Sequence, residues 1–294
     1  MKFKVLLVVV ALIQTIAEAQ NHQFFTVDDH PDIQRLVVLL NSRQSQGFIL
    51  PGETSALAEF EFGNAGGMTP LVEQPKLSGT KILHLNFDEL SAEQLGGLGN
   101  SSWFAGPRSA DQDWKLHLSE QKPLDLRLNY ATGKAEIDLS GLPVNRFNLS
   151  SGSADVVLHY ASGRPNPIEM DSLHLNVDWG SIRAKNLHLS NARHILADVY
   201  VGKLYMDFSC PVEKTATITA GVGAGRIEVI LPGGTAPVRI RFKDSPLCRV
   251  SIPDSFVRTD KSTFVYPAAN SSDNYMLDFV IDVAMGTVRF RSIP

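Results

Sequence analysis

The chain has 294 residues, of which 44% are hydrophobic and 20% charged, with a formal net charge of −4. It has too much apolar material and too little net charge for a disordered chain, and its mildly acidic balance argues against nucleic acid as a partner. Two cysteines are too few for a disulfide-dense scaffold or a four-thiolate zinc site. The length predicts one or two domains, each able to bury a core.

Residues 1–19 have the three parts of a secretory signal peptide. Two lysines give a positive start, Val5–Ile13 is apolar throughout, and the Ala-Glu-Ala of residues 17–19 forms a cleavage pattern. The apolar run is too short for a membrane-spanning helix, which needs about 20 residues. We therefore predict cleavage before Gln20 and an exported bacterial protein, periplasmic or extracellular, with no transmembrane segment after cleavage.

The two cysteines leave two interpretations open. Export would permit a disulfide between Cys210 and Cys248. Two unpaired thiols packed as small hydrophobic side chains fit the sequence equally well. The spacing of the two residues does not decide between them.

Residues 20–123 are irregular and are expected to form an N-terminal entry region that caps one end of the fold. Within it, Leu57–Phe62, Lys81–Phe87 and Trp114–Leu118 alternate between apolar and polar residues and predict strands. Pro31–Asn41 is either a short helix or a buried strand, because periodicity does not separate the two over so few residues.

From residue 124 to the C-terminus the chain repeats one phrase, in which a short alternating run meets a Gly and a second alternating run follows. The copies begin at residues 124, 146, 173, 194, 216, 239 and 276, and the copy at 239 is degenerate. Even offsets after the Gly are apolar, as at Ile137, Met206 and Val229. This period of two predicts strands with one buried face.

Two all-β architectures account for such a pattern. An antiparallel β-sandwich has short strands every 8–12 residues or so, whereas a parallel β-solenoid stacks each repeat as a coil on the preceding one. The shared phase of the repeats favours the solenoid over residues 124–294. There Ile137, Val156, Met206 and Val229 would form one apolar ladder. The repeated Gly fits a corner that needs a positive φ or close backbone approach, and the phase slip at Leu187–Leu189 predicts a bulge or turn.

The segment AGVGAGRIEVILPGGTAPVRIRF, Ala220–Phe242, resembles a known family. It and the preceding LxLxxxxGxxxxDL phrases are similar to the toast-rack and adhesin-like domains of bacterial envelope proteins, including the C-terminal domain of LiaF-type cell-wall-stress proteins. The matching positions are Gly221, Val222, Gly223, Arg226–Leu231, Pro232 and Val238–Ile240. The resemblance covers roughly residues 120–294. It implies a right-handed β-solenoid, in the envelope or outside the cell, without catalytic residues. Unlike the stress regulators, this chain has a cleavable signal and no anchor of several helices.

Histidine and carboxylate side chains are the candidates for metal binding or acid–base chemistry. Leucines flank His84, His117, His174 and His188, and Leu158 precedes His159, which predicts solvent-facing histidines on strands. The acids that mostly occupy outward strand positions are Asp125, Asp138, Asp155, Asp178, Asp198, Asp207, Glu228, Asp278 and Asp282. Lysines and arginines interleave with these acids, so we predict a salt-bridged outer surface and no metal site.

Other catalytic or cofactor motifs are absent or incomplete. Ser151-Gly152-Ser153 lacks the G-x-S-x-G elbow of a serine hydrolase, and the GVGAG of residues 221–225 lacks the Lys-Ser/Thr of a phosphate-binding loop and is predicted to be a corner. Aromatic residues that could stack on sugars are Trp103, Phe104, Trp114, Trp179, Tyr200 and Tyr205. Core packing is the expected role of each of them, although Trp179 precedes a corner, where a side chain can be exposed. No catalytic residue or cofactor is predicted.

The sequence thus favours an exported, non-catalytic solenoid that binds an envelope protein or a glycan, in an adhesin-like or envelope-maintenance role. One alternative is an enzyme that acts on polysaccharide, which acids clustered beside an Arg and an exposed Trp would support. Another is a partner subunit of a membrane stress sensor, which an uncovered patch at one end of the stack would support.

Overall fold

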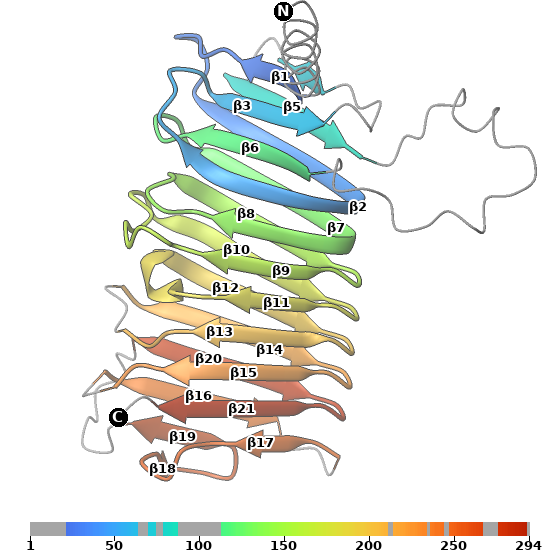
Figure 1. Ribbon diagram of the computed structural model, residues 1–294. Helices are drawn as coiled ribbons and strands as arrows, with labels where there is room; N and C mark the ends of the chain where they lie inside the picture. The colour runs from blue at the N-terminus through green and yellow to red at the C-terminus, as the bar shows by residue number, and fades with distance from the viewer. Residues whose placement is uncertain are drawn as a thin grey trace, which may run out of the picture.

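The computed structural model describes residues 22–63, 70–74, 79–87, 113–210, 214–233, 236–243, 247–266 and 276–292, which leaves the predicted signal peptide outside. These residues form a β-solenoid, a stack of coils built from strands (Figure 1). The strands are β1 (His22–Val27), β2 (Arg35–Gly52), β3 (Ala58–Gly63), β4 (Leu71–Glu73), β5 (Thr80–Asn86), β6 (Asp113–Ser119), β7 (Leu124–Asp138), β8 (Val144–Ser151), β9 (Asp155–His159), β10 (Met170–Val177), β11 (Ser181–Ala184), β12 (Ala192–Val199), β13 (Lys203–Asp207), β14 (Ala216–Val222), β15 (Arg226–Leu231), β16 (Val238–Lys243), β17 (Arg249–Ser251), β18 (Val257–Arg258), β19 (Thr263–Tyr266), β20 (Leu277–Val283) and β21 (Thr287–Ser292).

Each central coil consists of two strands joined by a short corner. In the first sheet, one half of β7 pairs with β8, and β10, β12 and β14 follow side by side in that order. The second strands, β9, β11, β13 and β15, pair with the other half of β7 and form the second sheet. All of these pairings are parallel, which confirms the predicted solenoid and excludes the antiparallel sandwich.

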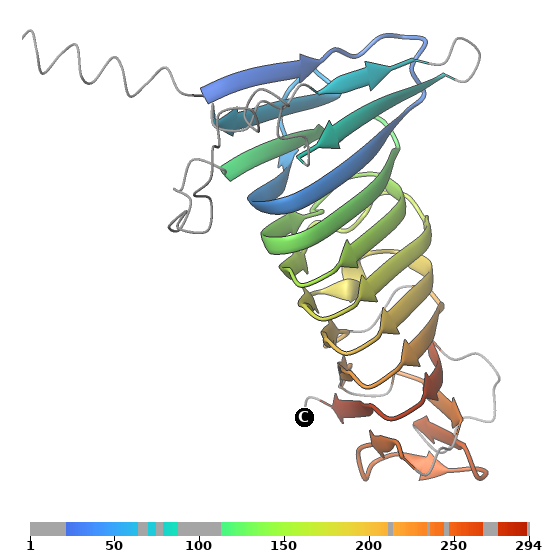
Figure 2. The same cartoon turned by 90° about the vertical axis from the view of Figure 1, so that its right-hand side faces the viewer.

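The coils at both ends are stacked out of chain order. β20 lies between β14 and β16 in the first sheet, and β21 lies between β15 and β17 in the second sheet. Figures 1 and 2 show this red C-terminal coil inserted above an orange one. At the other end, β2 lies between β7 and the later strands β5 and β6. The expectation that each repeat stacks on the preceding one is therefore wrong at the C-terminus. The degenerate copy forms the last coil, in which β16 pairs with β20 and β17 pairs with β21.

Antiparallel strands cover both ends of the stack. At the N-terminal end β3 pairs with β6, β1 pairs with β3, and β4 pairs with β5. At the other end β19 pairs with β16, and β18 with β19. The three strands predicted in the N-terminal region are present as β3, β5 and β6, and most of the ambiguous segment Pro31–Asn41 belongs to the strand β2. The added strands occupy backbone groups that would otherwise template pairing with another molecule.

The core lies between the two sheets and consists of apolar side chains stacked in register. One ladder of the second sheet comprises Ile137, Leu158, Ala184, Met206, Val229 and Phe290, all buried. The prediction of this ladder is correct except for Val156, which belongs to the neighbouring ladder opposite Ile182. The error arises because Ala154, not Gly152, takes the corner position equivalent to Gly180: the Ser181 N–H donates to the Ala154 carbonyl at 2.9 Å.

Glycine recurs at the corners because the backbones of neighbouring coils approach closely there. Gly202 has no positive φ, but a Cβ added to it would lie 2.4 Å from the Gly180 carbonyl oxygen. That oxygen accepts a hydrogen bond of 3.0 Å from the Lys203 N–H, which ties the two coils together. The GVGAG segment forms an equivalent corner between β14 and β15, as predicted. The phase slip near residue 188 is a short 3₁₀ turn, η4 (Leu187–Leu189).

Replacing Gly202 by Ala is expected to destabilise the protein by about 1–3 kcal/mol, because the methyl group would overlap a backbone carbonyl that is held in the ladder. Urea unfolding followed by circular dichroism measures the change. Gly221→Ala is the matched control, since its added Cβ would meet only the flexible Asp198 carboxylate, at 2.9 Å. Equal stabilities for the two variants would contradict this explanation of the corner.

In the described part of the chain, no helix reaches the length and apolar character needed to cross a membrane.

Candidate binding surface

A groove runs over the outer face of the second sheet, from β9 across β11 and β13 to β15. Its volume is about 780 Å³. The outward-facing side chains of β11 and β13 line much of it, because inward and outward positions alternate along each strand. The lining residues used below are Asp155, Trp179, Arg183, Lys185, Lys203, Tyr205, Asp207, Arg226 and Glu228.

Trp179 borders the groove at the corner between β10 and β11. Its backbone N–H donates to the Gly152 carbonyl at 2.7 Å, so the corner is fixed to the preceding coil, while the residue is 66% exposed. The equivalent corner positions of the next two coils are Val201 and Ala224. An exposed indole beside a groove is therefore a property of this coil, and it corrects the core packing expected of Trp179 in favour of the exposure that a place before a corner allows.

Basic side chains in the groove are free to meet a ligand. Arg183, Lys203 and Arg226 are exposed, and none of them forms an ion pair or side-chain hydrogen bond with any residue that the structure describes. Lys203 and Arg226 face outward at paired positions of neighbouring strands. Strands in a sheet lie about 4.8 Å apart, so the two cations repeat along the solenoid axis at roughly that spacing.

The acids of the groove are engaged by neighbouring protein groups. The Glu228 Oε1 lies 3.0 Å from the Arg291 Nε, and the Asp207 Oδ1 accepts a hydrogen bond of 2.8 Å from the Ser209 N–H. Asp155 accepts one from the Ser181 hydroxyl. The three acids of the lining therefore only partly offset the positive charge of its four cations, Arg183, Lys185, Lys203 and Arg226.

Tyr205 lies between these charges on β13 and contributes a neutral hydroxyl. Burial raises the pKa of Tyr205, and the nearby Asp207 and Glu228 raise it further, while Arg291 lowers it. The phenol therefore stays protonated at neutral pH and can donate a hydrogen bond to a ligand oxygen.

A second, shallower hollow lies on the first sheet and has the opposite charge. It has a volume of about 530 Å³ and contains Asp178, Asp198 and Asp282 beside Tyr200, which is 64% exposed. Trp179 and Tyr200 therefore lie near corners of successive coils but border hollows of different character, and the exposure of Tyr200 shows that the core packing expected of it is wrong.

Four of the five candidate histidines lie on outward strand positions, and one does not. His84, His117 and His174 lie between buried leucines, as predicted, and His159 follows buried Leu158. The His174 Nε2 lies 2.9 Å from the Asp198 Oδ2, and the His159 Nε2 lies 3.1 Å from the Glu136 Oε1. His188 lies in η4 because the chain turns there, which corrects its placement on a strand. Among the described residues, no group of three or more His, Cys, Asp or Glu is placed to hold a metal ion.

Two of the acids predicted to face outward are buried. Burial acts to raise the pKa of Asp278, but hydrogen bonds and charge from Arg239 and Arg241 hold it below its ordinary value. The Arg239 Nη2 and the Arg241 Nη2 each lie 2.7 Å from the Asp278 Oδ2. Asp138 is 9% exposed, because it ends β7 and folds back over the turn that follows.

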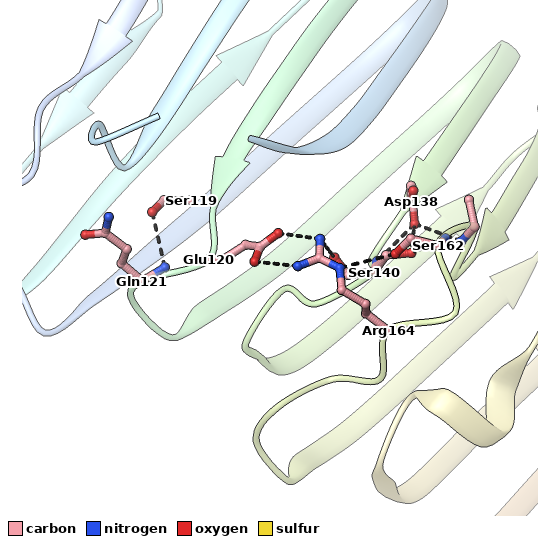
Figure 3. Close-up of polar contacts among 8 residues, drawn as sticks. Ser119, Glu120, Gln121, Asp138, Ser140, Ser162 and Arg164 are labelled. Carbon is pink, nitrogen blue, oxygen red and sulfur yellow. Dashed lines mark hydrogen bonds and ion pairs between the residues drawn. The ribbon is translucent and has the colours of Figure 1, made fainter. Parts of the chain in front are cut away.

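Figure 3 shows the polar cluster around Asp138, on the side of the stack where the longer loops lie. The Asp138 Oδ1 accepts hydrogen bonds from the N–H and the hydroxyl of Ser140, at 2.9 and 2.6 Å. Nearby, Arg164 makes a two-point contact with Glu120, at 2.7 and 2.6 Å, and donates to the Ser162 hydroxyl. These contacts join three loops, so the cluster has a structural role and leaves no acid free for chemistry.

The remaining candidates have structural roles or lie elsewhere. Trp114 is buried and stacks on Phe87 and Tyr130, as expected for core packing. Ser151 is buried and its hydroxyl donates to the Ala154 carbonyl at 2.6 Å, which stabilises a corner. Trp103 and Phe104 lie outside the described residues.

Both cysteines are free thiols, Cys210 exposed and Cys248 half-buried. Cys210 follows β13 and Cys248 precedes β17, and these strands are separated by β15 and β21. Three strand spacings place the coils roughly 14 Å apart, beyond the limit of about 7 Å between Cα atoms of a disulfide. The inserted C-terminal coil contributes one of these three spacings.

Comparison with protein families finds a similarity in the middle of the chain. Residues 85–172 match the family described as the N-terminal domain of toast_rack, DUF2154. The expected resemblance to toast-rack domains is confirmed there, although the match ends before Ala220–Phe242, on which the expectation rested. The matched range includes β7 to β9 and thus one end of the groove.

Two solved structures are similar to the chain over most of its length. One is a candidate cell adhesion protein from Clostridium sporogenes, with 16% identity, a TM-score of 0.42, and coverage of 92% of this chain and 99% of that one. The other is a candidate adhesin from Bacteroides fragilis, with 10% identity, a TM-score of 0.36, and coverage of 92% and 96%. No curated protein matches the chain.

Proposed function

We propose that this toast-rack solenoid is an exported, non-catalytic protein of the bacterial cell envelope that binds an envelope ligand in an adhesin-like role. The observation that carries the proposal is the groove beside Trp179, in which an exposed indole and several unpaired cations lie on a rigid outer face. A solenoid suits an extended ligand, because its coils repeat along one axis. The apolar run and cleavage pattern of residues 1–19 support export, with Gln20 as the first residue of the mature protein.

The second candidate is an enzyme that acts on polysaccharide, favoured by Asp155, Asp207 and Glu228 lining one groove with Arg183 and Trp179. Asp155 and Asp207 lie two coils apart, and Glu228 is held by Arg291. A hydrolase needs two carboxyl groups about 5–9.5 Å apart that flank the scissile bond, and at least one of them must be free to exchange protons. Binding without cleavage therefore explains this arrangement better. A partner subunit of a stress sensor would dock through an uncovered end, whereas both ends carry added antiparallel strands.

Co-sedimentation of residues 20–294 with washed envelopes of the source organism tests the proposal, using untreated and protease-stripped envelopes. We expect Trp179→Ala to reduce the bound fraction about tenfold, since exposed aromatic anchors contribute 1–3 kcal/mol to many interfaces. Tyr200→Ala is the matched control, because this residue is equally exposed near the next corner but borders the acidic hollow.

The outcomes separate the possibilities. Binding that survives stripping indicates a glycan or lipid ligand, and binding lost on stripping indicates a protein. The absence of sedimentation with either preparation would refute the proposed function. Shortening of released glycan during incubation would favour the enzyme.

A further inference from the structure

Two cations of the groove lie side by side on neighbouring strands. Lys203 and Arg226 occupy paired positions on β13 and β15, and the same row continues through Ser181 on β11 to Asp155 on β9. Arg183 lies two residues further along β11, on the same face and opposite Tyr205. Cations spaced by about one strand separation, 4.8 Å, match a polymer that carries one negative charge on each unit of similar length.

The backbone of the second sheet is not available to a ligand. β11 pairs with β9 on one side and β13 on the other, and β13 and β15 are likewise paired on both sides. An extended peptide typically adds to a free strand edge through main-chain hydrogen bonds. The groove has no such edge, so a ligand here is recognised by side chains alone.

The aromatic groups favour a sugar over other anions. The exposed Trp179 indole offers an apolar surface at the rim, on which the CH face of a sugar ring can stack. The protonated Tyr205 hydroxyl can donate a hydrogen bond to a sugar oxygen, and the Ser181 oxygen, whose hydrogen is donated to Asp155, can accept one from a sugar hydroxyl. A bare phosphate or a simple salt would need neither the indole nor a groove of this length.

We infer that the groove binds an acidic polysaccharide laid along the solenoid axis, with one ring on Trp179 and its acidic groups near Arg183, Lys203 and Arg226. This inference rests on the proposed envelope-binding function and specifies its ligand. The groove lining holds four cations and three acids, whereas the whole chain has a net charge of −4, so the excess of cations is a local property of this groove.

Isothermal titration of residues 20–294 with three polymers tests the inference. The probes are polygalacturonate, its fully methyl-esterified form, and poly-glutamate, at low and moderate salt. We expect polygalacturonate to bind, and its affinity to fall with salt as the charges are screened. We expect the esterified form to bind at least about tenfold more weakly, because the same sugar chain has lost its charge.

Variants locate the binding site. Lys203→Gln with Arg226→Gln should weaken polygalacturonate binding by about tenfold, as two exposed charge contacts are lost. Arg127→Gln is the control, since Arg127 is an exposed, unpaired cation on β7 and faces out from the first sheet among the described residues. Circular dichroism verifies that each variant is folded.

Each outcome supports or overturns the inference. Equal binding of the esterified polymer would refute charge recognition, and equal or tighter binding of poly-glutamate would indicate an acidic peptide. If none of the polymers bound while envelopes still sedimented the protein, the ligand class would be wrong and the proposed function would stand. Loss of envelope sedimentation would instead refute the proposed function, whatever the polymers do.

Discussion

A chain that ends at Met276 is expected to lose the order of β16 to β19 as well as the segment that is removed. β16 and β17 pair with β20 and β21, which join them to the rest of the stack. Without residues 277–294, the edges of β14 and β15 would be exposed, and exposed edges promote self-association. We expect new proteolytic cleavage within residues 247–266 and higher oligomers in sedimentation velocity.

Adding the removed segment back as a separate peptide distinguishes the loss of the inserted coil from a general loss of stability. A synthetic peptide of residues 276–294 should restore protease resistance, whereas the same peptide with Phe279→Asp should not, because Phe279 is buried between the coils. If the truncated chain kept the wild-type cleavage pattern and remained monomeric, the inserted position of β20 and β21 would be wrong.

Val229→Asp is expected to unfold the solenoid, with a loss of more than about 4 kcal/mol of unfolding free energy. Val229 is fully buried and stacks in register between Met206 and Phe290. A carboxylate at this position would have no cation or hydrogen-bond donor within the ladder, and burial of an unpaired charge is very costly. Loss of the cooperative unfolding transition, or recovery only in inclusion bodies, measures the effect.

Val280→Asp provides the matched control. It is the same substitution on β20, at a position that is 36% exposed and faces outward beside Thr219 and Arg241. We expect it to change stability by less than about 1 kcal/mol. A soluble, cooperative Val229→Asp protein, or equal losses for both variants, would show that the assignment of inner and outer faces is incorrect.

The local structure of the coils could be predicted because it depends on a pattern of period two. Burial of every second side chain places Ile137, Met206 and Val229 in one ladder whatever the length of the loops between coils. The register of Val156 could not be predicted, since it depends on which corner residue aligns with Gly180, and Ala154 takes that place. Counting from glycines fails wherever another small residue fills a corner.

The order of the coils could not be predicted, because the alternation of apolar and polar residues along a strand does not specify which strand lies beside it. Apolar and polar residues alternate in β16 as they do in β20, and the fold places β20 beside β14. For the same reason the sequence left the disulfide open, because the distance between Cys210 and Cys248 depends on how many strands lie between their coils.

The candidate site could be predicted only in part. The exposure of Trp179 follows from its place before a corner glycine, and the outward cations follow from strand alternation. Their union in one groove depends on the register of β11, β13 and β15, which the sequence does not contain. The burial of Asp138 and Asp278 arises from tertiary partners, namely a turn and two arginines from another strand.

Oxidative footprinting of the protein bound to envelopes locates the ligand directly, with the modification of each residue read by mass spectrometry. Bound ligand should protect Trp179 and Tyr205 at least several-fold relative to the free protein. Tyr200 and Met285, which are exposed near neighbouring corners but do not line the groove, should be modified as before. If envelopes bind the protein while Trp179 remains as reactive as in solution, the outer face of the second sheet is not the binding surface.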